Sequence, residues 1–279
     1  MTLAVVGYAE PWWIQIIKGL VIAALALQLV PVMLIAERKM LGRLQGRYGP
    51  NRIGPFGLLQ PIADIAKLIS KQDAVPFNAV GLIYAIAPII SIFTAVAAFA
   101  VIPFSNTVDI FGTQVGLYGV DPSIGLLYLF AFTAIAFYGL MLGGWASGSK
   151  YSFLGAMRAA AQLISYEIAM GLSVLGVLMM ASTLSLTGIV EAQQGMWYVI
   201  PQVVGFLIFL VAGFAETNRA PFDLPEADAE LVAGYNTEYG GGKFAAYFFS
   251  EYVNILVVSG IAVTMFLGGW QLPFGIEPP

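Results

Sequence analysis

The sequence contains no cysteine and no histidine, and only 10% of its 279 residues are charged. Without cysteine the chain can form no disulfide, iron–sulfur cluster or thiolate metal site, and without histidine it lacks the commonest haem, zinc and copper ligand. We therefore expect any redox centre that serves this protein to lie in another chain. Soluble domains carry roughly 25% charged residues, so these side chains are too few to cover a water-facing surface. The composition excludes an ordinary globular protein.

Long apolar segments take up most of the chain. About 20 helical residues span the hydrocarbon of a bilayer. Glycine, proline and small residues interrupt these segments without strict alternation, which favours helices over a β-barrel. We expect an all-α, multi-pass membrane protein that forms a single membrane domain over residues 1–279, with the lipid bilayer as a partner and no nucleic acid. The six segments that we expect to cross the membrane are 14–36, 78–102, 123–145, 159–181, 197–215 and 245–269.

The basic residues are distributed unevenly between the connecting segments. Eleven of the 12 lie in residues 37–77, 146–158 and 216–244, and the other connecting segments contain none. The positive-inside rule therefore predicts that these three segments face the cytoplasm and that both termini lie outside. The remaining base, Lys18, is expected to reach the outer interface with its side chain. The N-terminus lacks a basic region and a small-residue cleavage site, so we expect no removable signal peptide.

The basic cytoplasmic segment, 37–77, has two parts. Glycines and prolines between residues 42 and 57 predict tight turns, and their spacing matches no phosphate-binding loop. Residues 58–70 have the period of an amphipathic helix that lies in the interface plane. Two interpretations remain open: the helix shields the bundle, or it borders an opening for an amphipathic ligand from the lipid. Its apolar side carries Leu58, Ile62, Ile65 and Ile69, and its polar side carries Gln60, Asp64, Lys67 and Lys71.

Two carboxylates fall inside expected membrane helices. Glu167 lies in the fourth and Glu251 in the sixth. An ionised acid at this depth costs at least about 2.5 kcal/mol, so it must face the interior, be protonated or have a partner. Buried acids of this kind suit proton relay, because they exchange protons near neutral pH. The alternative is a structural hydrogen bond to a tyrosine or serine, such as Tyr166 or Tyr252.

The third cytoplasmic segment, 216–244, is acidic on the side where bases are normally placed. Apolar residues and prolines are interleaved with the acids, which favours a folded segment over a solvated tail. If Pro225 begins a helix, Glu226 and Glu230 lie on one face and their titrations couple. Such a cluster can store and pass protons. Its acids are Glu216, Asp223, Glu226, Asp228, Glu230 and Glu238.

Motifs in all three cytoplasmic segments resemble those of one family. The resemblance covers essentially the whole chain, with the motifs in the right order on the predicted cytoplasmic side. The family is that of the H subunit of NADH-quinone oxidoreductase, also called chain 1 of respiratory complex I. The motifs are RYGPNR at 47–52, GPFGLLQPIAD at 54–64, GWAS at 144–147, RAAAQLISYE at 158–167, and AETNRAPFDLPEADAE at 215–230 followed by TEY at 237–239.

The resemblance implies a membrane subunit that forms much of a quinone tunnel and the start of a proton path. A quinone, either ubiquinone or menaquinone, would be the substrate, and FMN and iron–sulfur clusters would lie in partner subunits. By this resemblance Arg38 and Lys39 lie beside the tunnel, and Asp64 and Lys67 lie near its mouth. The implied proton-handling residues are Glu167, Glu216, Asp223, Glu226, Asp228 and Glu230.

The resemblance also implies partners and a location. The partners are a hydrogenase-like quinone-site subunit, a terminal iron–sulfur subunit, small membrane subunits and antiporter-like subunits, in a bacterial cytoplasmic membrane. Family members usually continue for two helices beyond Gly269, so we expect the sequence to be a fragment. Many have His at Asn236 and Glu at Asp228, so neither position receives a fixed role. Two alternatives are the membrane anchor of an energy-converting hydrogenase and a stand-alone ion or solute transporter.

Overall fold

The computed structural model describes residues 11–105, 107–110 and 113–271, and helices make up most of this part of the chain. The helices are α1 (Trp12–Leu44), α2 (Gln60–Ser70), α3 (Gly81–Phe99), α4 (Gly125–Ala146), α5 (Lys150–Ala181), α6 (Leu186–Glu191), α7 (Val203–Glu216), α8 (Asp228–Leu231) and α9 (Gly241–Phe266). Two short 3₁₀ helices, η1 (Pro55–Gly57) and η2 (Gly234–Asn236), and one antiparallel hairpin of β1 (Thr107–Ile110) and β2 (Thr113–Gly116) complete the described part.

The expected all-α, multi-pass architecture is confirmed. Helices α1, α3, α4, α5 and α9 are each long and apolar enough to cross a membrane. The segment expected at 197–215 differs: turns occupy residues 198–202, and α7 has 14 residues. Pro201 explains the late start, because its ring and missing N–H disrupt a helix that runs through it. At 1.5 Å per residue, α7 is about 21 Å long, which is shorter than the hydrocarbon layer.

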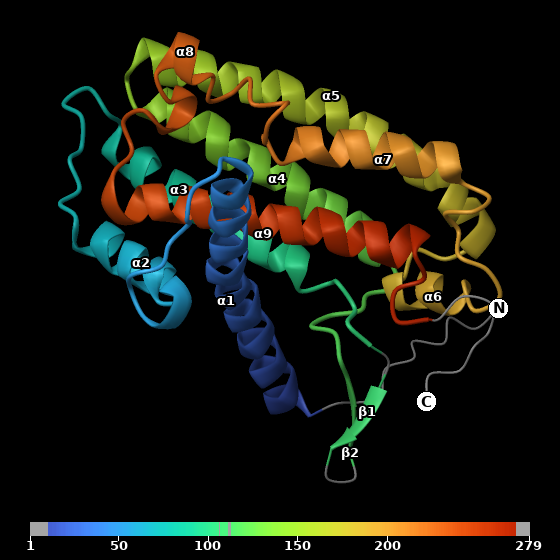
Figure 1. Ribbon diagram of the computed structural model, residues 1–279. Helices are drawn as coiled ribbons and strands as arrows, with labels where there is room; N and C mark the ends of the chain where they lie inside the picture. Colours follow the sequence, from blue (N-terminus) through green and yellow to red (C-terminus); the bar gives the residue numbers. More distant parts are fainter. Residues whose placement is uncertain (1–10, 106, 111–112, 272–279) are drawn as a thin grey trace.

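The membrane helices form a bundle in which α3 packs against α4 and α9, and α5 packs against α4 and α7. Figure 1 shows α1 running across this bundle, in contact with α9 and α3. Small residues allow the close approaches. A Cβ at Gly139 of α4 would lie 2.2 Å from the Ser91 hydroxyl of α3. Glycine at such a position is the usual way for membrane helices to pack closely.

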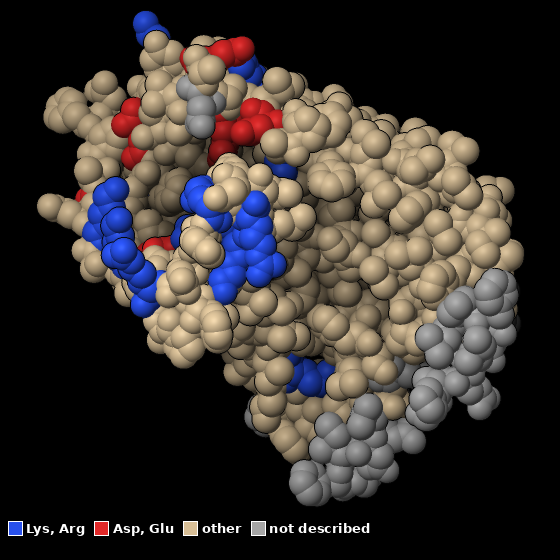
Figure 2. All heavy atoms as spheres, viewed as in Figure 1, with Lys and Arg blue, Asp and Glu red and all other residues tan. Residues whose placement is uncertain are grey.

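The charged residues gather at one end of the bundle. Figure 2 shows most of the blue and red spheres at the end that holds α2 and α8, with a smaller blue group near the hairpin end. The segments predicted to face the cytoplasm therefore share one end. Lys18 lies at the other end, where its Nζ is 4.8 Å from the centroid of the Tyr118 ring. The sequence did not predict this aromatic contact.

Candidate functional site

Helices α1 and α2 are joined by polar side chains. Arg38 of α1 donates a hydrogen bond to the Asp64 carboxylate of α2, and Gln60 donates a second one at 3.0 Å. Burial raises the pKa of Asp64, but the hydrogen bonds from Gln60 and Arg38 and the charges of Arg38 and Lys67 outweigh it, so the net pKa lies below its usual value. The structure thus brings Arg38, Asp64 and Lys67 together.

Lys39 lies apart from this group. Its side chain lines a groove on the surface of α1, together with Ala36, Met40, Arg43 and Leu44. Successive helical residues point about 100° apart, so Arg38 and Lys39 face different surroundings. Of the four residues implied to border a tunnel, three form one cluster and the fourth does not join it.

Only part of the apolar side of α2 faces away from the bundle, because Ile65 is half-buried and the helix packs against α9. Ile62 and Ile69 are 60% and 71% exposed, whereas Asp64 on the polar side meets α1. Residues 58 and 59 precede the helix, which begins at Gln60 and ends at Ser70, close to the predicted limits. The helix therefore presents an apolar edge with Ile62 and Ile69 outward, and it presents Asp64 to α1.

Arg219, in the turn after α7, connects α1 with α9. Its Nη1 lies 3.1 Å from Glu37 Oε1, and its Nε lies 2.5 Å from Glu251 Oε1. The guanidinium also lies 4.4 Å from the centroid of the Tyr252 ring, and the Tyr252 hydroxyl donates to Glu37 Oε2 at 2.6 Å. Glu251 therefore has a cationic partner, which is neither the tyrosine nor the serine considered as the structural alternative for the buried acids.

Sequence reasoning did not select Glu37 or Arg219 for the site. The sequence contains one indication that each of these two residues could belong to a site. Glu37 is an acid at the end of an apolar segment, beside two bases, and Arg219 is the only base among residues 216–230. Neither signal identifies the partner, because α1 and the turn after α7 meet only in the folded bundle.

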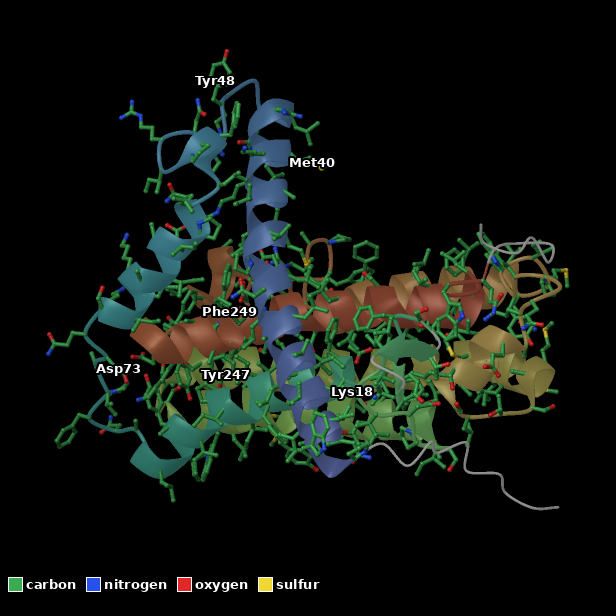
Figure 3. The ribbon with its side chains drawn as sticks, turned by 90° about the horizontal axis from the view of Figure 1, so that it is seen from below. Lys18, Met40, Tyr48, Asp73, Tyr247 and Phe249 are labelled. Carbon is green, nitrogen blue, oxygen red and sulfur yellow. The ribbon has the colours of Figure 1, made fainter. Side chains whose placement is uncertain are left out.

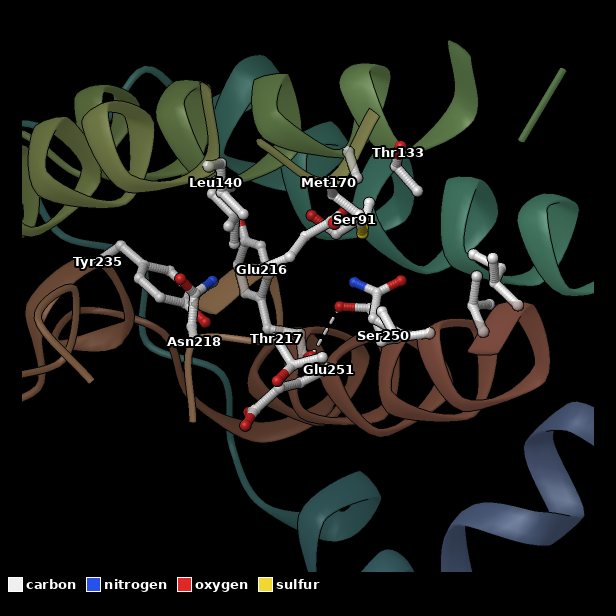
Figure 4. A pocket seen from close by; sticks show the side chains of 17 residues that line it. Ser91, Thr133, Leu140, Met170, Glu216, Thr217, Asn218, Tyr235, Ser250 and Glu251 are labelled. Atoms are coloured by element: carbon white, nitrogen blue, oxygen red, sulfur yellow. Dashed lines mark hydrogen bonds between the residues drawn. The ribbon is translucent and has the colours of Figure 1, made fainter. Parts of the chain in front are cut away.

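A cavity with both apolar and polar lining lies inside the bundle, next to the ion pairs of Arg219. It offers about 40 Å³ to the centres of water molecules, which is room for about three waters. Figure 4 shows the Glu216 side chain near its middle. One Glu216 carboxylate oxygen is buried and has no hydrogen-bond partner among the described residues. The polar lining comes from α3, α4, the end of α7, η2 and α9, and includes Ser91, Thr133, Glu216, Tyr235, Ser250, Glu251 and Asn254.

Glu167 lies beside the cavity. Its neighbours on the same face of α5, Leu163 and Met170, line the cavity wall. The charges of Glu167 and Glu216 lie close enough to interact. Two acids predicted to handle protons, one from a membrane helix and one from the acidic segment, are thus neighbours.

The acidic segment adds two further carboxylates to this group. Asp223 and Glu226 both act electrostatically on Glu251, and Glu226 also accepts a hydrogen bond of 3.0 Å from Asn236. We define the acidic cluster as Glu167, Glu216, Asp223, Glu226 and Glu251.

The predicted helix from Pro225, with Glu226 and Glu230 on one face, is wrong. Helix α8 covers only Asp228–Leu231, and Ala227 has φ +33°, which breaks the helical path between the two acids. Glu230 instead forms an exposed ion pair with Arg158 of α5 at 2.6 Å. Asp228 was also predicted to handle protons, but its side chain lies outside the described part of the chain.

Comparison with known proteins identifies the family. A family model described as NADH dehydrogenase matches residues 17–278. The H subunit of the NADH-quinone oxidoreductase of Thermomicrobium roseum is 48% identical over 94% of this chain and 80% of the relative. The H 2 subunit of Geobacter sulfurreducens is 50% identical over 91% and 76% of the two chains, and the H subunit of Protochlamydia amoebophila is 52% identical over 86% and 74%. The chain therefore belongs to the NADH dehydrogenase family and is a homologue of the H subunit of NADH-quinone oxidoreductase.

Proposed function

We propose that this protein is the membrane subunit of a proton-pumping NADH-quinone oxidoreductase that borders the quinone's path and couples quinone reduction to proton movement. The names of its relatives support the complex and the quinone substrate. Electrons reach the quinone from FMN and iron–sulfur clusters in partner subunits, since a chain without cysteine and histidine lacks the usual ligands for such clusters. The charged end of the bundle faces the cytoplasm and meets those redox subunits.

The quinone enters from the bilayer between α1, α2 and α9. The outward apolar edge of α2, with Ile62 and Ile69 exposed, suits contact with an isoprenoid tail or lipid. The polar contact of Arg38 and Asp64 between α1 and α2 suits the passage of a headgroup with carbonyl oxygens, because Arg38 offers N–H donors. Both features favour a helix that borders an opening over one that merely shields the bundle.

The observation that carries the coupling proposal is the position of Arg219 between Glu37 and Glu251. Glu37 belongs to α1, on the side of the proposed entrance, and Glu251 lines the cavity. Negative charge that appears near Arg219 competes with Glu251 for this cation, which favours uptake of a proton by the acidic cluster. At an effective dielectric of about 20, a unit charge about 10 Å away interacts by roughly 1.7 kcal/mol, or about one pKa unit.

Protons then pass through the cavity to Glu167 and onward to antiporter-like subunits. The cavity has room for waters that can bridge Glu216 to its neighbours, and Glu216 interacts electrostatically with Glu167. The amide in a Glu167→Gln variant cannot ionise, so we expect the complex to move fewer protons per quinone reduced. The measurement is proton uptake during quinone reduction by membrane vesicles.

The matched control is Glu191→Gln, which removes an exposed acid from α6 at the opposite end of the bundle. We expect this control to pump normally. Normal proton stoichiometry in Glu167→Gln would contradict the proton path, and ion transport by the purified chain alone in liposomes would favour a stand-alone transporter. Failure of a photoreactive quinone to label this chain in the intact complex would favour a hydrogenase anchor.

A further inference from the structure

Lys243 occupies an unfavourable position in α9. It lies in the first turn of the helix, where the helix dipole is positive and a basic side chain is repelled. Two contacts offset this repulsion. The Lys243 Nζ lies 2.7 Å from Asp73 Oδ2 and 4.5 Å from the centroid of the Tyr84 ring. Lys243 thus connects the start of α9 with α3 and with the chain that follows α2.

The Tyr84 ring is a rigid support for this contact. The side chain is fully buried in α3 and stacks on Tyr239, with 4.3 Å between ring centroids and 7° between planes. Its hydroxyl donates to the carbonyl oxygen of Glu238 at 2.7 Å. A cation over a ring that is partly shielded from water gains more than one at an open surface. The position of the Lys243 ammonium is therefore set by the bundle, and Asp73 is held to it.

A backbone contact also joins the start of α9 to the chain that follows α2. Gly241, the first residue of α9, has φ +55°, and a Cβ there would lie 3.0 Å from the carbonyl oxygen of Lys71. Glycine at this position allows the chain after α2 to approach the start of α9 closely. Figure 3 shows Asp73 at the end of α2, beside this start. The C-terminal end of α2 is thus attached to α9, while Arg38 and Asp64 attach its first half to α1.

We propose that Asp73 and Lys243 are positioning residues that hold the C-terminal end of α2 against α9, and that they thereby set the width of the proposed entrance between α1, α2 and α9 and its preference for long-tailed quinones. The inference rests on the proposed entry of quinone beside α2. Without the ion pair, the C-terminal end of α2 separates from α9 and the isoprenoid tail loses apolar contacts. The headgroup reacts elsewhere, so the loss raises KM for long-tailed quinones with little change in kcat.

The test compares a long-tailed with a short-tailed quinone in membranes that contain the intact complex. In Lys243→Gln we expect KM for the long-tailed quinone to rise about fivefold, while kcat and the short-tailed KM stay close to wild type. Lys243→Arg keeps the charge and restores the long-tailed KM. Lys150→Gln is the matched control, because Lys150 is an exposed base at the first residue of α5, on the same side of the membrane.

Equal KM values for the long-tailed quinone in Lys243→Gln and wild type would overturn the inference, as would an equal rise for both quinones. If the complex with Lys243→Gln does not assemble, Asp73→Asn removes the other partner of the same ion pair. The same comparison of KM values for the two quinones then tests the inference. The Asp64→Asn variant distinguishes a failure of this inference from a failure of the proposed quinone entry beside α2. A KM effect in Asp64→Asn without one in Lys243→Gln rejects only the role of the ion pair, whereas unchanged KM values in both place the entrance away from α2.

Discussion

Arg219 shows how much one side chain contributes to the candidate site. A guanidinium has five N–H donors in a planar fork, so a single arginine can hold two carboxylates at once. Here the two are Glu37 and Glu251, which lie on helices at opposite ends of the sequence. A lysine at this position, with its point charge, would not hold both in the same geometry. A change at one carboxylate is therefore transmitted to the other through one shared cation.

Asp64 leads to a prediction about pH. Its pKa is lower in the folded protein than in the unfolded chain, so its contribution to stability is present above the unfolded value, near pH 4, and is lost as the pH falls through the folded value. We expect Asp64→Asn to be less stable than wild type at pH 7 and this difference to shrink below about pH 4. Thermal unfolding of both proteins from pH 3 to pH 7 measures it. A difference that stays constant over this range would show that the Asp64 charge contributes nothing.

At the scale of elements, the packing of α3 against α4 depends on Gly139. A methyl group there would lie 2.2 Å from Ser91 Oγ and 3.0 Å from the Ser91 nitrogen. Because the backbone cannot yield as a side chain does, we expect Gly139→Ala to destabilise the protein by about 1–3 kcal/mol. The control is Gly171→Ala in α5, where the added Cβ meets nothing within 4 Å. Alanine at that helical position is expected to be neutral or slightly stabilising, and equal melting temperatures for the two variants would contradict the packing argument.

The helix limits show what hydropathy can and cannot predict. The apolar segments expected at 14–36 and 159–181 belong to helices that continue to Leu44 and begin at Lys150. Hydropathy detects the part of a helix that lies in hydrocarbon, whereas the helix itself continues through polar residues until its backbone hydrogen bonds end. The helix predicted from Pro225, with Glu226 and Glu230 on one face, was wrong for a different reason. The left-handed conformation at Ala227 is imposed by the surrounding fold and has no glycine or asparagine to signal it.

At the scale of the whole molecule, the charged end of the bundle predicts its orientation. The chain has no native cysteine, so one introduced cysteine gives a unique label. We expect a membrane-impermeant maleimide to label Arg47→Cys only from the cytoplasmic side and Gln194→Cys, beyond α6, only from the outside. Right-side-out and inverted vesicles provide the measurement. Labelling of both positions from the same side would contradict the proposed topology.

The sequence alone determined the class of protein, the membrane segments apart from the short α7, and the amphipathic helix α2. These features depend on transfer of side chains from water to hydrocarbon and on local periodicity, which are properties of short segments. Only the tertiary structure decided that Arg219 pairs with Glu37 and Glu251, that Arg38 pairs with Asp64, and that Lys243 attaches α9 to the end of α2. Those contacts join residues far apart in the chain, and their energies depend on distance and burial, which exist only once the helices have packed.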